Sequence, residues 1–236
     1  MTRFDDHGRP LPFYSLNGIT IYDGDCLDIL PTIEPGSVDL VLTDPPYGIN
    51  ERTDRASKKR GTETRGLIRH PSRDWVAIAG DSEPFDPTHL LIYPRIVLFG
   101  ANHFADRLPA SRGWLVWDKR NGATTDDNAD AELIWTNIPG VIRMYRQCWR
   151  GFAREGSESG QKHIHPTQKP VAIMEWLLDR YSKPGDLILD PYMGSGPVAA
   201  ACRKMNRRYI GIEIVDEYVV AACKRLLQTA MNLEVA

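Results

Sequence analysis

The chain has 236 residues, a quarter of which are charged, and a formal net charge of −2. This length allows one large α/β domain with a sizeable core, and we expect residues 1–236 to form a single domain. No apolar stretch is long enough to span a membrane, and the first residues lack the apolar core of a signal peptide, so we expect a cytoplasmic protein. The four cysteines form no CxxC pair, which favours reduced thiols and argues against a zinc site.

The charge is unevenly distributed along the chain. Residues 50–73 carry a net charge of +5 and residues 143–162 a net charge of +3, so the remainder is acidic. Two basic segments on an acidic body indicate a polyanion bound at one face, although a solvated basic loop is the alternative for each. We expect a mobile loop at about 50–74 that closes over this polyanion and a short recognition segment at about 137–164. The candidate residues for binding the polyanion are Arg52, Arg55, Lys58, Lys59, Arg60 and Arg65.

Predicted strands alternate with predicted helices along the chain. Strands are expected at residues 19–22, 38–43, 95–100, 114–118, 132–136, 187–190 and 209–214, and helices at 27–33, 171–181, 198–205 and 216–231. This alternation predicts an α/β fold with a doubly wound, mainly parallel sheet covered on both faces. Trp114, Trp117 and Trp135 lie on predicted strands, and we expect them in the core.

The first chemical motif comes directly after the apolar strand 38–43. Asp44, Pro45, Pro46 and Tyr47 present a carboxylate, a backbone without two of its N–H donors, and an aromatic ring. An exocyclic amino group on a nucleobase has two N–H donors beside a flat ring, which these acceptors and the tyrosine would match. A proline-rich turn without function is the alternative.

The second motif is a strand, a glycine turn and a helix. Gly194 and Gly196 permit positive φ and close approach of a ligand, and Glu213 ends the following strand, where an acid can bind both ribose hydroxyls. The spacing also matches the GxGxxA fingerprint of NAD-binding proteins. However, Pro197 stands where a pyrophosphate needs free N–H groups, and Asp190 would repel phosphate. S-adenosylmethionine, which has an ammonium group and no phosphate, therefore fits this turn better than NAD.

With these motifs, the sequence resembles the amino-directed DNA methyltransferases, specifically the permuted class in which the catalytic tetrapeptide precedes the glycine motif. Residues 44–47 match its DPPY, residues 190–196 its D-P-F-x-G-S-G, residues 165–170 its HPTQKP, and residues 24–30 its G-D-x-L-x-x-L. The resemblance covers residues 19–231. It implies a Rossmann-like methyltransferase fold, S-adenosylmethionine as cofactor, DNA as partner, a place in restriction-modification, and an assembly for which a homodimer is one option.

The resemblance also implies a role for each matching residue. Asp44 would accept one N–H of the target amine and the Pro45 carbonyl the other, while Pro46 fixes the turn and Tyr47 stacks on the base. Proton loss can follow methyl transfer, because the methylated amine is acidic. The implied cofactor-binding residues are Asp25, Cys26, His165, Thr167, Gln168, Lys169, Asp190, Pro191, Tyr192, Gly194, Ser195, Gly196 and Glu213.

Two departures from the family pattern keep alternatives open. Pro197 replaces the usual threonine, which puts a hydroxyl contact to the cofactor in doubt, and Tyr192 replaces phenylalanine. Adenine is the favoured target because the cytosine members more often begin the tetrapeptide with serine. Cytosine-N4 methylation is the first alternative, and a catalytically inactive nucleic-acid-binding relative is the second. Methylation of a protein glutamine is disfavoured, because that group usually carries asparagine first in the tetrapeptide and has its glycine motif earlier in the chain.

Overall fold

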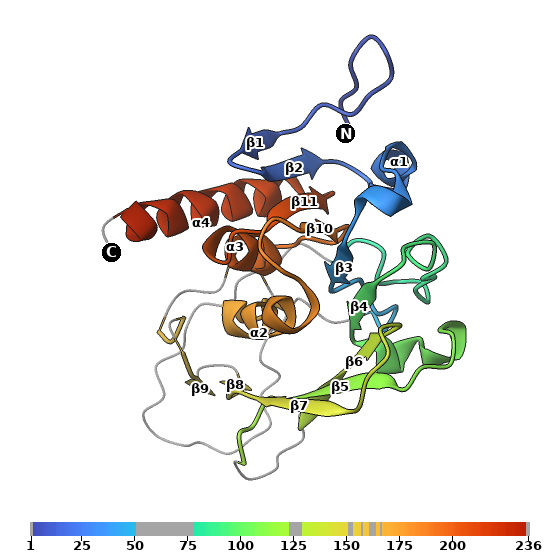
Figure 1. Cartoon of the computed structure of the whole chain (residues 1–236), viewed down its shortest axis with the longest axis vertical. Coiled ribbons are helices and arrows are strands. Elements are labelled where there is room, and N and C mark those ends of the chain that lie inside the picture. The colour runs from blue at the N-terminus through green and yellow to red at the C-terminus, as the bar shows by residue number, and fades with distance from the viewer. Residues whose placement is uncertain are drawn as a thin grey trace, which may run out of the picture.

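The computed structural model describes residues 2–50, 78–122, 129–150, 153–156, 158–160, 164–165 and 167–234 (Figure 1). A nine-stranded sheet runs through the molecule in the order β1-β2-β11-β10-β3-β4-β6-β5-β7. These strands are β1 (Tyr14–Leu16), β2 (Ile19–Asp23), β11 (Arg208–Glu213), β10 (Leu187–Asp190), β3 (Leu40–Thr43), β4 (Ile96–Phe99), β6 (Ala131–Thr136), β5 (Gly113–Asp118) and β7 (Arg143–Arg146). A separate two-stranded ribbon consists of β8 (Trp149–Arg150) and β9 (Ala153–Arg154).

The five central strands β2, β11, β10, β3 and β4 are all parallel to one another. Antiparallel pairing occurs where β1 meets β2 and where β6 meets β4 and β5. From the middle of the sheet the chain proceeds outward in two directions, from β3 to β4 and from β10 to β11. The carboxyl ends of β3 and β10 therefore flank a topological switch point, where open α/β sheets place their ligands.

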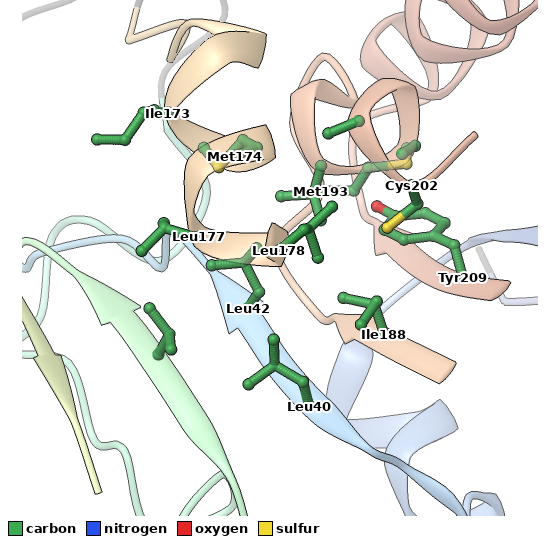
Figure 2. Packing of buried hydrophobic residues seen from close by; sticks show 14 of the residues in the cluster. Leu40, Leu42, Ile173, Met174, Leu177, Leu178, Ile188, Met193, Cys202 and Tyr209 are labelled. Carbon is green, nitrogen blue, oxygen red and sulfur yellow. The ribbon is translucent and has the colours of Figure 1, made fainter. Parts of the chain in front are cut away.

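Three helices cover one face of the sheet (Figure 1). They are α2 (Val171–Tyr181), α3 (Pro197–Lys204) and α4 (Asp216–Glu234), and α3 contacts both of the others. Figure 2 shows strand residues Leu40, Leu42 and Ile188 facing Leu177 and Leu178 of α2. All five side chains are fully buried, so this apolar contact attaches the helices to the strands that end at the switch point.

Short elements cover the opposite face. These are α1 (Cys26–Ile29) and the 3₁₀ turns η1 (Leu30–Thr32), η2 (Pro35–Ser37), η3 (Ala101–His103) and η4 (Ala105–Arg107). A second apolar cluster beneath them includes Phe85, Leu90, Tyr93 and Phe104, all buried. The sheet is thus covered on both faces, as the sequence predicts, and the fold is Rossmann-like with a mainly parallel sheet.

The predicted elements agree with the structure to within a few residues. Strand 187–190 and helix 171–181 are predicted at their observed bounds. The predicted helix 27–33 is instead one turn of α-helix, α1, followed by η1, because Pro31 cannot continue the α-helical hydrogen bonds. Strands β1, β7, β8 and β9 were not predicted, since their burial alternates weakly or they are only two residues long.

The other expectations for the core are also reflected in the structure. Trp117 and Trp135 are almost fully buried, at 1% exposure each, whereas Trp114 is only half-buried and packs against the second cluster. All four cysteines are free thiols, and Cys26 and Cys202 are buried. Among the described helices, none combines the length and the apolar character needed to cross a bilayer.

Candidate active site

The two chemical motifs meet at the carboxyl ends of the neighbouring strands β3 and β10. The Thr43 hydroxyl donates to Asp190 Oδ1 at 2.6 Å, and the amide of Tyr192 donates to Thr43 Oγ1 at 3.3 Å. Thr43 is the last residue of β3 and directly precedes Asp44. One buried hydroxyl therefore fixes the start of the tetrapeptide against the start of the glycine turn.

The Asp44 carboxylate has a partner on each oxygen. Tyr47 Oη lies 2.6 Å from Oδ1, and Lys169 Nζ lies 2.7 Å from Oδ2. The Asp44 side chain is 23% exposed, whereas that of Lys169 is only 7% exposed. Asp44 thus stands at the edge of a mostly buried cluster and remains partly open to a ligand.

Glu132 completes the cluster from strand β6. Its Oε1 lies 2.9 Å from Tyr47 Oη and 3.2 Å from Lys169 Nζ, and its Oε2 accepts from Lys119 Nζ at 3.2 Å. Two carboxylates and two ammonium groups therefore balance in charge around one phenol, which limits the cost of burying them. Sequence analysis missed Glu132, because an acid on a strand far from both motifs gives no local signal.

Burial and the neighbouring charges shift the ionisation of this cluster. Burial raises the pKa of Asp44 most strongly, Lys169 opposes that shift, and Glu132 adds to it. Burial would by itself lower the pKa of Lys169, but Asp44 and Glu132 raise it above its ordinary value. The Lys169 and Lys119 ammonium groups outweigh burial at Glu132 and hold its pKa below the ordinary range. Of the two carboxyls, Asp44 is therefore the one more readily protonated.

The ring of Tyr47 packs between other residues instead of standing free. Its centroid lies 4.9 Å from that of His103, with a 12° angle between the two planes, in a stacked arrangement. Gly100 has a positive φ of 62°, and a Cβ at this position would come within 2.0 Å of the Tyr47 ring. Gly100 is therefore required for close packing. The stacking partner seen in the structure is the exposed His103, which sequence analysis did not assign.

The backbone that follows the tetrapeptide is held by another carboxylate. Asp81, 4% exposed, accepts hydrogen bonds from the amides of Tyr47 at 3.0 Å and Gly48 at 2.8 Å. Pro45 is buried, and Pro46 lies against Gly80. Asp81 thus satisfies amide donors that the turn leaves free and fixes the position of Tyr47.

The glycine turn has the backbone that the sequence predicts. Gly194 has φ 54° and Gly196 has φ 72°, both in the left-handed region. A Cβ on Gly196 would also come within 2.9 Å of the Ala222 side chain in α4. Glu213 braces the turn, because its Oε2 accepts from the Gly194 amide and its Oε1 from the Val215 amide, both at 2.8 Å.

Asp190 occupies a different place from the one expected for a direct contact with a cationic ligand. It is 1% exposed, and its two oxygens accept from the hydroxyls of Thr43, at 2.6 Å, and Tyr209, at 3.1 Å. Burial raises its pKa to about 7. Its role in this structure is therefore to join strands β3, β10 and β11 beneath the turn, since its oxygens face the interior.

Asp25 and Cys26 lie near Tyr192, two residues before the first glycine of the turn. Asp25 Oδ1 accepts from the Leu27 amide at 2.8 Å and so caps α1. Burial raises the pKa of the Cys26 thiol to about 11, which makes it a small apolar group next to the Tyr192 hydroxyl. The Tyr192 hydroxyl lies 2.9 Å from His89 Nε2. An aromatic and carboxylate-bearing surface thus borders the turn.

The residues before α2 separate into two groups. His165 lies edge-on to Tyr218, at 4.3 Å between ring centroids, and borders Gly194. Its pKa falls to about 3 because it is buried next to Lys169 and Arg225. Thr167 contacts His165 Nδ1 at 3.3 Å.

Gln168 and Lys169 point elsewhere. Gln168 is buried, its side chain contacting Glu158 at 3.3 Å, and its carbonyl accepts from the Trp149 indole at 2.8 Å. Lys169, expected at the cofactor, is instead paired with Asp44, because the chain turns inward just before α2. Contact of Lys169 with the cofactor stays a prediction, and the pairing with Asp44 places its ammonium group beside the tetrapeptide.

Two further residues of the glycine turn, Pro191 and Ser195, are both buried. Ser195 is 2% exposed, and among the described residues its hydroxyl has no hydrogen-bond partner. The predicted loop at about 50–74 lies outside the described residues from position 51 onward, and with it all six candidate DNA-binding residues, Arg52, Arg55, Lys58, Lys59, Arg60 and Arg65.

A parallel sheet with a glycine turn at one central strand end and an Asp-Pro-Pro-Tyr at the next defines a Rossmann-like methyltransferase. Comparison with known proteins agrees with this class. Residues 110–224 match the family model described as "DNA methylase", N6_N4_Mtase. The type II methyltransferase M.HinfI of Haemophilus influenzae is 27% identical over 256 residues, which cover 90% of this chain and 69% of that protein.

Solved structures give the same result at the level of the fold. The M1.HpyAVI-SAM complex has a TM-score of 0.53 at 24% identity, covering 88% of this chain and 98% of that one. The cytosine-N4-specific PvuII DNA methyltransferase has a TM-score of 0.58 at 16% identity, covering 91% of this chain and 88% of that one. Residues 110–224 are thus similar to the amino-directed, N6 or N4, DNA methyltransferases, and the fold of the chain is that of an S-adenosylmethionine-dependent methyltransferase.

Proposed function

We propose that this protein transfers a methyl group from S-adenosylmethionine to the exocyclic amino nitrogen of adenine in DNA. The observation that carries the proposal is the Thr43–Asp190 hydrogen bond of 2.6 Å, which brings the amine-binding tetrapeptide and the glycine turn together. Methyl transfer requires a donor and an acceptor in line at one place. A glycine turn alone would fit many nucleotide-binding proteins, whereas a glycine turn next to an amine-binding tetrapeptide fits methyl transfer to an amine.

The cofactor would lie over the glycine turn. Glu213 is partly exposed at the end of β11, and each of its oxygens keeps a lone pair beyond its bond to a backbone amide, so it can also accept from ribose hydroxyls. Asp25 and Tyr192 would border the adenine on the other side. The sulfonium supplies an activated methyl group. Pro197 does not oppose this arrangement, because it is the first residue of α3, where proline is favoured.

The target amine would bind at the partly exposed carboxylate of Asp44. One N–H would donate to Asp44 and the other to the Pro45 carbonyl, which localises the nitrogen lone pair for attack on the methyl carbon. Tyr47 and His103 together provide an aromatic surface against which an unstacked base can lie. The basic residues between Arg52 and Arg65 would bind phosphate.

Cytosine-N4 methylation is the second candidate, because both bases offer the same amino group to this site. Its support is the likeness of the fold to the cytosine-N4-specific PvuII enzyme. Adenine is preferred on the tetrapeptide alone, since the residue at its first position is aspartate rather than serine.

The experiment is transfer of a radiolabelled methyl group from S-adenosylmethionine to DNA by the purified protein. Digestion to nucleosides followed by mass spectrometry distinguishes N6-methyladenine, the expected product, from N4-methylcytosine. Cofactor binding without label in DNA would favour the inactive relative, and label in protein would favour the glutamine alternative. Binding of NAD in place of S-adenosylmethionine would overturn the assignment.

A further inference from the structure

Both oxygens of the Asp44 carboxylate are already engaged in the structure. Tyr47 Oη is 2.6 Å from Oδ1 and Lys169 Nζ is 2.7 Å from Oδ2. If Asp44 is to accept an N–H from a target amine, as the proposed function requires, these partners compete with the amine for its lone pairs. A group that can accept them in its place would remove that competition.

Glu132 is the group in position to do so. Its Oε1 lies within reach of the same two donors, 2.9 Å from Tyr47 Oη and 3.2 Å from Lys169 Nζ. A phenol hydroxyl has one proton and can donate to only one of the two carboxylates at a time. The hydroxyl of Tyr47 therefore donates either to Asp44 or to Glu132, and a small rotation of its O–H bond changes the acceptor.

The lysine is equally well placed to change its acceptor. Its Nζ lies near three oxygens, Asp44 Oδ2, Tyr47 Oη and Glu132 Oε1, at 2.7, 3.1 and 3.2 Å. The ammonium also lies 5.5 Å from the ring centre of Tyr47 and 5.6 Å from that of Phe99, in cation–π contact with both. Because these contacts do not involve Asp44, Lys169 can turn toward Glu132 without being left as an unpaired buried charge.

We propose that Glu132 is a positioning residue that takes over Lys169 and the Tyr47 hydroxyl when the target amine binds, and so frees Asp44 to accept the amine. The inference rests on the proposed function, because it concerns how the amine enters that site. The Glu132 side chain is 10% exposed and that of Asp44 is 23% exposed, so an incoming base reaches Asp44 first. Lys119, 3.2 Å from Glu132 Oε2, holds Glu132 in the ionised form that the exchange needs.

The test is a double-mutant cycle of Glu132→Gln and Lys169→Met, measured as methylation of DNA by the full-length protein with S-adenosylmethionine. Glu132→Gln keeps the shape but loses the charge, so Lys169 stays on Asp44. We expect kcat/KM for DNA to fall about 10- to 100-fold, mainly through KM, with the dissociation constant for S-adenosylmethionine within about twofold. In the Lys169→Met background the ammonium competitor is gone and only the Tyr47 hydroxyl still competes, so the same glutamine substitution should change KM less than threefold. Equal effects in both backgrounds would overturn the proposal.

A second measurement needs no turnover and separates this inference from the proposed function. Carboxyl-labelled aspartate followed by NMR gives the pKa of Asp44 in wild type and in Glu132→Gln. Loss of the neighbouring negative charge should lower that pKa if the two carboxylates share Lys169. An unchanged pKa of Asp44 in Glu132→Gln would overturn the exchange even if the wild type methylates DNA. A lowered pKa in Glu132→Gln, together with a wild-type protein that leaves DNA unlabelled, would defeat only the proposed function. Glu175→Gln, which breaks the surface pair with Lys204, is the matched control and should change neither readout.

Discussion

Thr43 and Asp190 are 147 positions apart in the chain, yet the hydroxyl of the first donates to the buried carboxylate of the second at 2.6 Å. The same hydroxyl oxygen accepts from the Tyr192 amide at 3.3 Å. This contact aligns the residue before the Asp-Pro-Pro-Tyr tetrapeptide with the first residues of the glycine turn. It is therefore the point at which stability and function of the site depend on one side chain.

Replacing Thr43 with valine should destabilise the protein. The substitution keeps the shape but leaves Asp190 Oδ1 without its donor in a buried site, and such a loss costs about 1–3 kcal/mol. Urea unfolding would measure the change in the free energy of unfolding. Thr20→Val is the control and should cost much less, because among the described residues the Thr20 hydroxyl is hydrogen-bonded to the Ser15 hydroxyl alone, at 3.5 Å near the surface. Equal stability of Thr43→Val and wild type would mean that this hydrogen bond contributes nothing.

Asp190 should make stability depend on pH in the neutral range. Its pKa is about 7 in the folded protein against 3.8 as the ordinary value, so the folded state binds the proton more tightly than the unfolded state. The contribution of Asp190 to the free energy of unfolding is therefore fully present below about pH 4. It is lost as the pH rises through 7, for a total of order 4 kcal/mol. Asp190→Asn cannot ionise and should show a flatter dependence between pH 5 and 8 in urea unfolding. A parallel dependence in both proteins would contradict the assignment.

Asp44→Ala should abolish methylation and leave the dissociation constant for S-adenosylmethionine within a few-fold of wild type. Asp44 is assigned to the target amine, and the lysine it leaves behind still has Glu132 as a partner at 3.2 Å. Radiolabel transfer and calorimetry measure the two effects separately. Asp44→Asn should retain some rate, because its amide oxygen still accepts. Full activity of the alanine variant would defeat the mechanism.

Glu213→Ala should weaken S-adenosylmethionine binding by roughly 1.5–3 kcal/mol, the range for hydrogen bonds to a charged group. The structure adds a second cause, because Glu213 also accepts from the amides of Gly194 and Val215 and so braces the turn. Calorimetry would measure the change in affinity. Glu217→Ala is the control, since Glu217 is exposed on α4. Binding unchanged in Glu213→Ala would remove Glu213 from the cofactor site.

Replacing Lys58, Lys59 and Arg60 with alanine should raise the dissociation constant for DNA and reduce the salt dependence of binding. Three lost phosphate contacts would change the slope of log K against log salt by about 2.7 in duplex DNA. Affinity measured at several salt concentrations provides the slope. If neither the affinity nor the slope changes, the DNA-binding surface must be sought among Arg143, Arg146 and the basic residues that follow.

By itself, the amino-acid sequence determined most of the central strands and helices and the two motifs. Apolar runs such as residues 187–190 predict buried strands wherever they occur, and Gly194 and Gly196 predict positive φ because few other residues adopt it. The order of strands and helices then favoured a mainly parallel sheet. These features are local, and each can be inferred from a short window of the chain.

Only the tertiary structure decided which charges share a site. Glu132 reaches the cluster because β6 pairs antiparallel with β4, and Lys169 reaches it because the chain before α2 turns toward Asp44. Sequence analysis placed Lys169 at the cofactor and gave Asp190 a ligand-facing role. Partner choice among buried charges depends on distances across strands and on the cost of leaving a charge unpaired, and neither quantity is present in the local sequence.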